Sequence, residues 1–541
     1  MTKKPLTVTV ITDTHYYSPR IGTRGDAYDK ANAKSQKLLN GSREVLDAAF
    51  RQIKADSRTD IVLLSGDTTN NGELWSHEEA IEQLRDLKAS GKRVYVITAT
   101  HDYTPDDWTW GYDGNEKVKI PGVLREQLYD MYREFGPNEA IAVHRESMSY
   151  VVQLEEGYRL FAINDDSNHA GKSGVSEELF EWIAEQAEDA RKNDQFIVAM
   201  THHPLIAPSP MYEIIGHGDM MGDYEIRREQ FADMGIQFIL TGHTHVHDID
   251  KYVSKKGNYI YDIATAATIG YPAPIRTIVF DPEMSMVTTT TDLINELVDF
   301  DMGGKSLQEY LEYQLIGVAK DMIKAAGTNI KKFADMATAI SIPKKKSLRI
   351  GWLIKLPMKL LNKLKIGTVG NWTRAETGLK KSDYADIKDK YVVDFMADLV
   401  LNLYGGKSLY SPDDNEYKIT IGLLNIIDSI FKALHISVRK LLKVSDTIRG
   451  IIEPLLYNNG IPSYDAMMPI MPLYEGEQTG PQPEAAKVPD TVKESKKGPF
   501  IVAIAILILI LLLPLIICVG LPVLLIGYII NAIKYKDIYK A

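Results

Sequence analysis

The residues of this chain that are best suited to chemistry are aspartates and histidines in five short segments. The segments are Asp13-Thr14-His15, Gly66-Asp67, Thr100-His101-Asp102, His202-His203-Pro204 and Gly242-His243-Thr244-His245. Carboxylate oxygens and imidazole nitrogens suit hard or borderline divalent cations. The single cysteine, Cys518, lies far from these segments in the sequence, so a thiolate site is excluded. The residue types predict a hydrolytic centre that holds two metal ions.

Each of these segments follows a short apolar run that we expect to be a strand. The runs are 6–11, 61–64, 94–97, 196–200 and 238–240, and their Val, Ile, Leu and Phe content is typical of strands buried on both faces. Helical patterns lie between them at 76–89 and 176–192, each opened by a serine that can cap the first turn. Functional groups of open α/β sheets gather beyond the carboxyl ends of the strands, so the five segments are predicted to converge on one crevice.

The order of the motifs resembles that of the calcineurin-like metallophosphoesterase superfamily, whose pattern is DxH, GDxx, GNH with an acid, a lone His, and GHxH. Finer features are similar to the bacterial class III cyclic-nucleotide phosphodiesterase branch: the run from Gly66 to Glu73, the His-His-Pro turn, and Tyr271-Pro272 to Arg276. The resemblance covers residues 5–292. It implies an α/β fold, the four-layer αββα sandwich of that superfamily.

The resemblance also implies a ligand set for two divalent ions, which we expect to be Mn, Fe or Zn. The ligands of one ion would be Asp13, His15, Asp67 and His245, and those of the other would be Asp67, which bridges the two, His202 and His243. The family's last ligand is the Asn of GNH, and Thr100 occupies that position here. A hydroxyl is a poorer neutral donor than an amide carbonyl, so we predict that the second ion is bound more weakly.

The expected chemistry is attack on phosphorus by a shared hydroxide. Two metal ions about 3.5 to 4 Å apart lower the pKa of a bridging water and stabilise both the attacking and the leaving oxygen. His101 is predicted to donate a proton to the leaving oxygen, with Asp102 orienting its ring through the other nitrogen. The prediction is a phosphoric ester hydrolase for a small phosphodiester or phosphomonoester. The alternative is a catalytically weakened scaffold, in which Thr100 marks decay and a later helical region carries the function.

The length of 541 residues predicts more than one domain. We expect a metallophosphoesterase domain at 1–292, a mainly helical domain of unknown role at 293–473, a flexible linker at 474–498, a transmembrane anchor at 499–530 and a short basic tail at 531–541. The net charge is −10, and the acidic excess lies in the first of these parts. Binding of a nucleic acid polymer requires phosphate neutralisation by Lys and Arg, so none is expected.

The stretch 499–530 contains no charged residue, and about 20 apolar residues are enough to cross a bilayer. Pro514 and Pro522 leave a re-entrant hairpin open as an alternative to a single pass. The sequence from Met1 to Pro5 leads directly into the first predicted strand without a secretory signal. We therefore expect a cytoplasmic catalytic domain tethered to the cell membrane by a single-pass C-terminal anchor.

A second membrane contact is predicted within the helical region. The segment 344–365 has eight basic residues and no acidic one, interleaved with leucines and a tryptophan. Such a pattern suits an anionic membrane interface. The candidate lipid-binding residues are Lys344, Lys345, Lys346, Arg349, Trp352, Lys355 and Lys359. The alternative is a solvated turn followed by a core helix, since Gly351 and Pro357 interrupt the pattern. The sequence does not identify a protein partner for the helical region.

Overall fold

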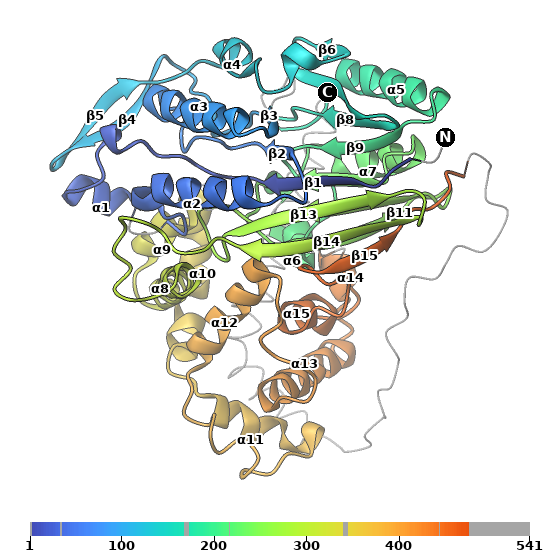
Figure 1. Cartoon of the computed structure of the whole chain (residues 1–541). Coiled ribbons are helices and arrows are strands. Elements are labelled where there is room, and N and C mark those ends of the chain that lie inside the picture. The colour runs from blue at the N-terminus through green and yellow to red at the C-terminus, as the bar shows by residue number, and fades with distance from the viewer. Residues whose placement is uncertain are drawn as a thin grey trace, which may run out of the picture.

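A computed structural model of the chain describes residues 3–32, 35–166, 173–215, 217–338, 344–442 and 444–474. Two β-sheets form the upper part of the molecule in Figure 1, and a bundle of helices lies below them. The α/β fold and the helical region expected from the sequence are both present. Among the described residues, no helix combines the length and apolar character needed to cross a bilayer. The predicted anchor and tail, and the linker from residue 475 on, lie outside the described residues.

The first sheet has six strands in the order β15-β14-β13-β1-β2-β3. Their bounds are β1 Leu6–Ile11, β2 Ile61–Ser65, β3 Arg93–Ile97, β13 Pro274–Asp281, β14 Met286–Leu293 and β15 Ala466–Pro469. The strands β1, β2 and β3 are parallel to one another. Their carboxyl ends therefore meet at one edge, as predicted from the motifs that follow them.

The second sheet has seven strands in the order β11-β12-β10-β9-β8-β7-β6. Their bounds are β6 Ala142–His144, β7 Ser149–Glu155, β8 Tyr158–Ala162, β9 Phe196–Met200, β10 Phe238–Thr241, β11 Asp248–Val253 and β12 Tyr259–Ala264. Within this sheet, the neighbouring strands β12, β10, β9 and β8 are parallel to one another. A separate hairpin is formed by β4 Trp108–Asp113 and β5 Glu116–Pro121.

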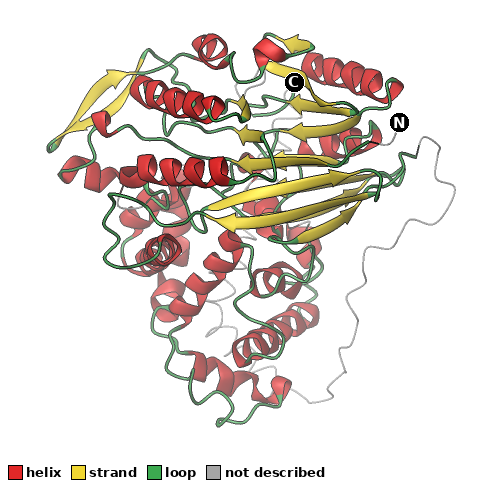
Figure 2. Cartoon of the chain, in the orientation of Figure 1, coloured by secondary structure: helices red, strands yellow, loops and turns green. Residues whose placement is uncertain are grey.

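The two sheets pack against each other through a shared apolar core, with residues such as Val8 and Leu63 from one sheet and Leu160 and Leu240 from the other. Two further cores cover the outer faces of the sheets. The covering helices are α2 Ser42–Ala55 and α3 Leu74–Ala89 on the first sheet, and α5 Glu177–Lys192 and α7 Tyr224–Asp233 on the second. The layers thus run helix, sheet, sheet, helix, in the order that the resemblance implied (Figure 2).

One of the two predicted serine caps is confirmed. The side chain of Ser176 accepts a hydrogen bond from the backbone N–H of Leu179 and caps α5. The prediction for Ser76 is wrong, because α3 begins two residues earlier, at Leu74. Ser76 is buried, and its hydroxyl accepts the backbone N–H of Ser18 instead. Tertiary contact, rather than the local cap, decides its role.

Smaller elements connect these layers. They are η1 Pro19–Ile21, α1 Asp26–Asn32, η2 Leu39–Gly41, α4 Arg125–Tyr132, η3 Pro137–Glu139, α6 Pro210–Ile215 and η4 His217–Asp219. The helical region consists of α8 Leu307–Thr328, α9 Ile330–Thr338, α10 Lys344–Leu361, α11 Ile366–Thr377, α12 Val392–Gly405, α13 Asn415–Ala433, α14 Val438–Leu442 and α15 Arg449–Leu456. It has an apolar core of its own, built largely from these helices.

The helical region is joined to the sheets by its last segment. The strand β15 pairs antiparallel with β14, although it lies more than 170 residues later in the chain. Arg276 of β13, fully buried, donates hydrogen bonds to the carbonyls of Ser463 at 2.8 Å and Ala264 at 3.0 Å. The boundary predicted at 292/293 therefore divides the sequence but not the first sheet.

We expect Arg276→Met to destabilise this junction. The substitution leaves buried carbonyls of Ser463 and Ala264 without their donor, and an unpaired buried polar group costs about 1–3 kcal/mol. The free energy of unfolding should fall by about 2 kcal/mol in urea titrations. Arg85→Met is the matched control, because Arg85 forms an exposed ion pair with Glu134 that contributes less than about 1 kcal/mol. Equal losses in the two variants would contradict the assignment.

Candidate metal centre

The predicted ligands lie where two parallel strands of each sheet end. Asp13 follows β1, Asp67 follows β2, His202 follows β9 and His243 follows β10. Five of the predicted ligands have a positive φ, a backbone conformation that is uncommon outside glycine: Asp13 (50°), His15 (36°), Asp67 (50°), His243 (62°) and His245 (57°). Backbone strain concentrated in this way is typical of functional sites. The two sheets thus contribute to one crevice, as predicted.

Asp13, His15 and His245 form the first group of candidate ligands, and all three are buried. The Nε2 atom of His245 lies 3.2 Å from Oδ1 of Asp13, and Nε2 of His15 lies 3.6 Å from the same oxygen. The two Nε2 atoms are 3.0 Å apart. These three side chains therefore present their coordinating atoms to a common point.

Asp67, His202 and His243 form the second group. The Nε2 atom of His202 lies 3.1 Å from Oδ2 of Asp67 and 3.2 Å from Nδ1 of His243. The other ring nitrogen of His202, Nδ1, is 2.8 Å from the carbonyl of Ser65. A hydrogen bond donated from Nδ1 to that carbonyl leaves the Nε2 lone pair directed at the centre of the group.

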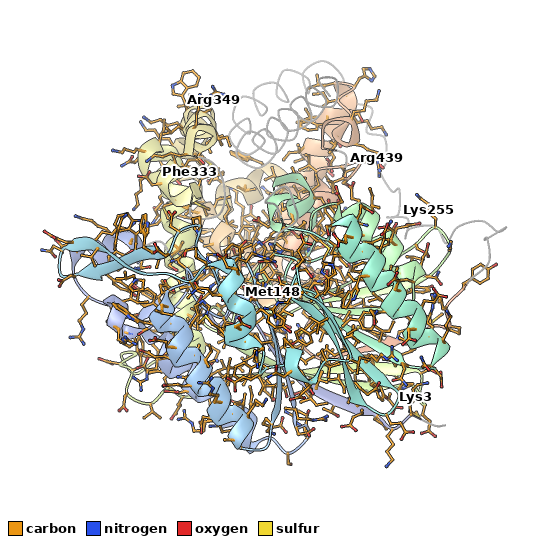
Figure 3. All side chains as sticks on the ribbon, turned by 90° about the horizontal axis from the view of Figure 1, so that it is seen from above. Lys3, Met148, Lys255, Phe333, Arg349 and Arg439 are labelled. Atoms are coloured by element: carbon orange, nitrogen blue, oxygen red, sulfur yellow. The ribbon has the colours of Figure 1, made fainter. Side chains whose placement is uncertain are left out.

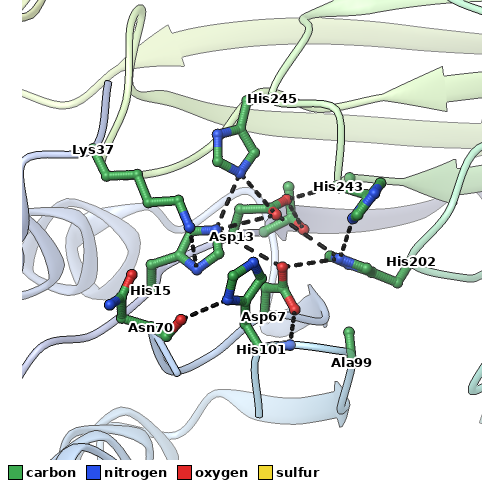
Figure 4. A network of polar contacts seen from close by, with 12 residues as sticks. Asp13, His15, Lys37, Asp67, Asn70, Ala99, His101, His202, His243 and His245 are labelled. Atoms are coloured by element: carbon green, nitrogen blue, oxygen red, sulfur yellow. Dashed lines mark hydrogen bonds and ion pairs between the residues drawn. The ribbon is translucent and has the colours of Figure 1, made fainter. Parts of the chain in front are cut away.

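Asp67 lies between the two groups, as Figure 4 shows. Its Oδ2 atom is 3.1 Å from Nε2 of His202 in the second group and 3.8 Å from Nε2 of His15 in the first. Its Oδ1 atom accepts the backbone N–H of His101 at 2.9 Å, which fixes the orientation of the carboxylate. Asp67 is thus positioned as the bridging ligand that the resemblance implied.

The donor set fits divalent cations. Oδ1 of Asp13 is buried and makes no hydrogen bond with the described residues, although two imidazole nitrogens lie within 3.6 Å of it. Burial by itself disfavours the charged carboxylate, but His245 and His202 outweigh it and hold the pKa of Asp13 well below its usual value. Burial lowers the pKa of His202, whereas Asp67 and Asp13 raise it to about 10. A metal ion would take the place of that proton.

His101 and Thr100 line a cavity of about 490 Å³ beside the metal centre. The Nδ1 atom of His101 lies 2.6 Å from the carbonyl of Asn70, and its ring packs edge-on to His15 with centroids 4.9 Å apart. Burial, together with the positive charge of Lys37, lowers the pKa of His101 to about 4. The position of Thr100 is compatible with the ligand role implied for it, which stays a prediction.

The role predicted for Asp102 differs from the one in the structure. Its carboxylate accepts backbone N–H groups of Thr69 and Ala99, both at 2.8 Å, and the hydroxyl of Thr69 at 3.2 Å. Asp102 was expected to orient the ring of His101 through a hydrogen bond to one ring nitrogen. That nitrogen, Nδ1, instead hydrogen-bonds to the carbonyl of Asn70. Asp102 is fully buried. Its carboxylate supplies the acceptor that the buried backbone N–H groups of the two loops would otherwise lack. It fixes the loops that carry Asp67 and His101.

Two residues of the site escaped the sequence analysis. Lys37 lies with Nζ 3.2 Å from Nδ1 of His15, and burial lowers its pKa to about 8 despite the nearby Asp67 and Asp13. No motif surrounds Lys37, so the sequence contains no signal for it. Asp165 accepts the backbone N–H groups of His202 and His203. It follows β8, and the rule that functional groups lie beyond strand ends would have identified it.

Comparison with known proteins finds similarity over the part of the chain that contains these residues. A family model described as calcineurin-like phosphoesterase matches residues 6–247 of the chain. No curated protein matches the chain. Among solved structures, the chain is similar to a dimetal phosphatase from Danio rerio, with 12% identity, 54% of this chain and 98% of that chain covered, and a TM-score of 0.38. It is also similar to the NAD nucleotidase of Haemophilus influenzae, with 11% identity, 64% and 61% covered, and a TM-score of 0.32.

We predict two Mn²⁺ sites of unequal affinity. Calorimetric titration of the metal-free protein should resolve a tighter and a weaker site, because a threonine hydroxyl is a poor ligand. Thr100→Asn should strengthen the weaker site and leave the tighter one unchanged. Thr290→Asn, on an exposed position of β14, is the matched control and should leave both affinities as they are. Two equally tight sites in the unmodified protein would contradict a ligand role for Thr100.

Proposed function

We propose that the protein is a two-metal phosphodiesterase that hydrolyses a small phosphoester. The observation that carries this proposal is the pair of ligand groups with Asp67 between them, within a calcineurin-like phosphoesterase domain. Two bound divalent ions would activate a water and stabilise the charge on the phosphoryl oxygens. The preference for a diester is supported by the resemblance of the run Gly66 to Glu73, the His-His-Pro turn and Tyr271-Pro272 to Arg276 to the class III phosphodiesterase branch.

The protein's own residues supply binding and proton transfer. Asp13, His15 and His245 would hold one ion, and His202 and His243 the other, with Asp67 shared between them. The Nδ1–H of His101 donates to the Asn70 carbonyl, so only the imidazolium form carries an Nε2–H that can pass to the leaving oxygen. A substrate phosphoester beside the ring would favour that protonated form, because its negative charge raises the pKa of His101. The cavity beside His101 then holds the leaving group, and Tyr103, Tyr112 and Trp110 are part of its wall.

We further propose that the catalytic domain is cytoplasmic and tethered to the cell membrane by residues 499–530. The absence of any charge over this stretch supports the proposal. The scaffold alternative is less well supported, because six of the seven predicted ligands belong to the two groups and Oδ2 of Asp67 lies within 3.8 Å of Nε2 of both His202 and His15. A protein selected only for its helical region would have no need to keep these buried charges.

Asp67→Asn should abolish hydrolysis. The amide removes the negative charge that the two ions would share, so turnover of bis-(p-nitrophenyl) phosphate with Mn²⁺ should fall to background. The unmodified protein should hydrolyse this diester faster than p-nitrophenyl phosphate. Asp86→Asn changes an exposed aspartate of α3 and should leave both rates unchanged. Equal activity of the Asp67→Asn and unmodified proteins would refute the enzyme assignment and favour the scaffold.

His101→Ala should separate proton donation from metal binding. Loss of a general acid typically lowers the rate by about 100- to 10,000-fold, so kcat for an alkyl ester should fall within this range. The Mn²⁺ content, measured by elemental analysis, should stay at the level of the unmodified protein. His144→Ala, which alters a histidine hydrogen-bonded to Ser147 outside the site, is the control. Loss of metal from the His101→Ala protein would make His101 a ligand instead.

A further inference from the structure

The helix α10 has two different apolar faces, and the described residues cover one of them. On the covered face, Ile354, Met358 and Leu361 are buried in the core of the helical region. Gly351 lies on this face too, where an added Cβ would come within 2.7 Å of Ile330 and 3.0 Å of Phe333. The alternative reading of 344–365 as a turn plus a core helix is thus half right, since α10 contributes one face to a core.

The opposite face of α10 carries four large apolar side chains in contact with solvent. They are Leu348, Trp352, Leu356 and Leu360, with exposed fractions of 39%, 74%, 67% and 48%. Each follows the previous one by four residues, so together they form a stripe along one side of the helix. We call these four residues the α10 stripe. Exposure of apolar side chains in one row is unusual for a soluble surface and marks an interaction site.

Basic side chains are interleaved with the α10 stripe. Lys345, Arg349, Lys355 and Lys359 are all exposed, and their spacing puts them on the same side of the helix as the stripe. Of the described basic residues of α10, only Lys344 forms a salt bridge with a described carboxylate, that of Asp335. The side chain of Lys346 lies outside the description. No acidic residue occurs between 344 and 365, so this face carries only positive charge.

We propose that the α10 stripe and its basic residues dock onto the surface of an anionic lipid bilayer. The leucines and Trp352 would enter the boundary between headgroups and acyl chains, where amphipathic helices rich in Lys and Arg bind. The basic residues would contact the negative headgroups beside them. This inference is independent of the proposed hydrolytic function, because no residue of the metal centre takes part in it.

The arrangement favours a lipid surface over a protein partner. A protein interface typically has an apolar centre depleted of charge, with polar residues at its rim. On α10 the charges lie between the apolar residues along the whole stripe. Long Lys and Arg side chains can extend to headgroups while their stems cover apolar surface, so a bilayer accepts both kinds of residue at once. The uncharged stretch 499–530 would bring the same chain to a membrane.

A second exposed segment has the same composition. Leu434 and Ile436, between α13 and α14, are 52% and 37% exposed. Lys432 precedes them, and Arg439 and Lys440 follow in α14. Figure 3 shows Arg349 of α10 and Arg439 of α14 toward the edge of the molecule that lies away from Lys3. Two basic and apolar segments at this edge would allow the helical region to contact a bilayer at more than one point.

The test measures the polarity around the stripe in the full chain. Because Cys518 is the single cysteine, Cys518→Ser combined with Leu356→Cys gives one site for a polarity-sensitive nitrobenzoxadiazole label. With vesicles of phosphatidylcholine and phosphatidylserine, the emission should shift to the blue and rise at least two-fold. The shift should weaken with added salt, which screens the basic residues. Vesicles of phosphatidylcholine alone should give a smaller shift.

Two further proteins act as controls. Ile226→Cys in the Cys518→Ser background labels an apolar residue of α7 that is 59% exposed, and its emission should not change. Arg349→Glu with Lys355→Glu, added to the Leu356→Cys protein, should abolish the shift while hydrolysis in solution is retained. A water-like emission at position 356 in protein bound to anionic vesicles would overturn the proposal. A blue shift without vesicles that grows with protein concentration would also overturn it, and would indicate pairing of two copies.

Discussion

The candidate metal centre depends on two buried carboxylates that need positive charge beside them. Asp13 and Asp67 are almost fully buried, and four imidazoles surround them. Transfer of a carboxylate from water to a protein interior is costly unless positive charge accompanies it. Divalent cations meet this requirement and at the same time satisfy the orphaned Oδ1 atom of Asp13. The same ions would supply the proposed chemistry, so the composition of the site and its proposed activity would have one physical cause.

Polar residues around the site hold the loops of the predicted ligands in place. Asp102 and Asp165 are acidic residues at strand ends, like the ligands, yet their carboxylates accept backbone N–H groups of the ligand loops. The bond from Thr69 supports the turn in which Asp67 has a positive φ, and those accepted by Asp165 hold the turn of His202. Strained loops persist only when neighbouring contacts determine them. An acidic residue in a motif can therefore serve the backbone instead of the reaction.

The helical region is joined to the first sheet and also exposes apolar side chains to solvent. The strand β15 and the hydrogen bonds of Arg276 join it to the first sheet, so the two parts share a core boundary. The helix α10 packs one face into the helical core and leaves the α10 stripe in solvent. A helix that is apolar on both sides requires a second apolar environment. In the docking that we propose, the surface of a membrane would be that environment.

The sequence by itself determined the ligand types and their places at strand ends, because buried parallel strands are recognisable as apolar runs and motifs follow them directly. It also identified the basic and apolar composition of 344–365. Only the tertiary structure decided that Asn70, and not Asp102, engages the ring of His101, and that Lys37 lies beside His15. It likewise decided that β15 completes the first sheet and which side chains of α10 remain exposed. These features depend on contacts between residues distant in the chain, and local patterns of hydrophobicity and charge carry no information about such contacts.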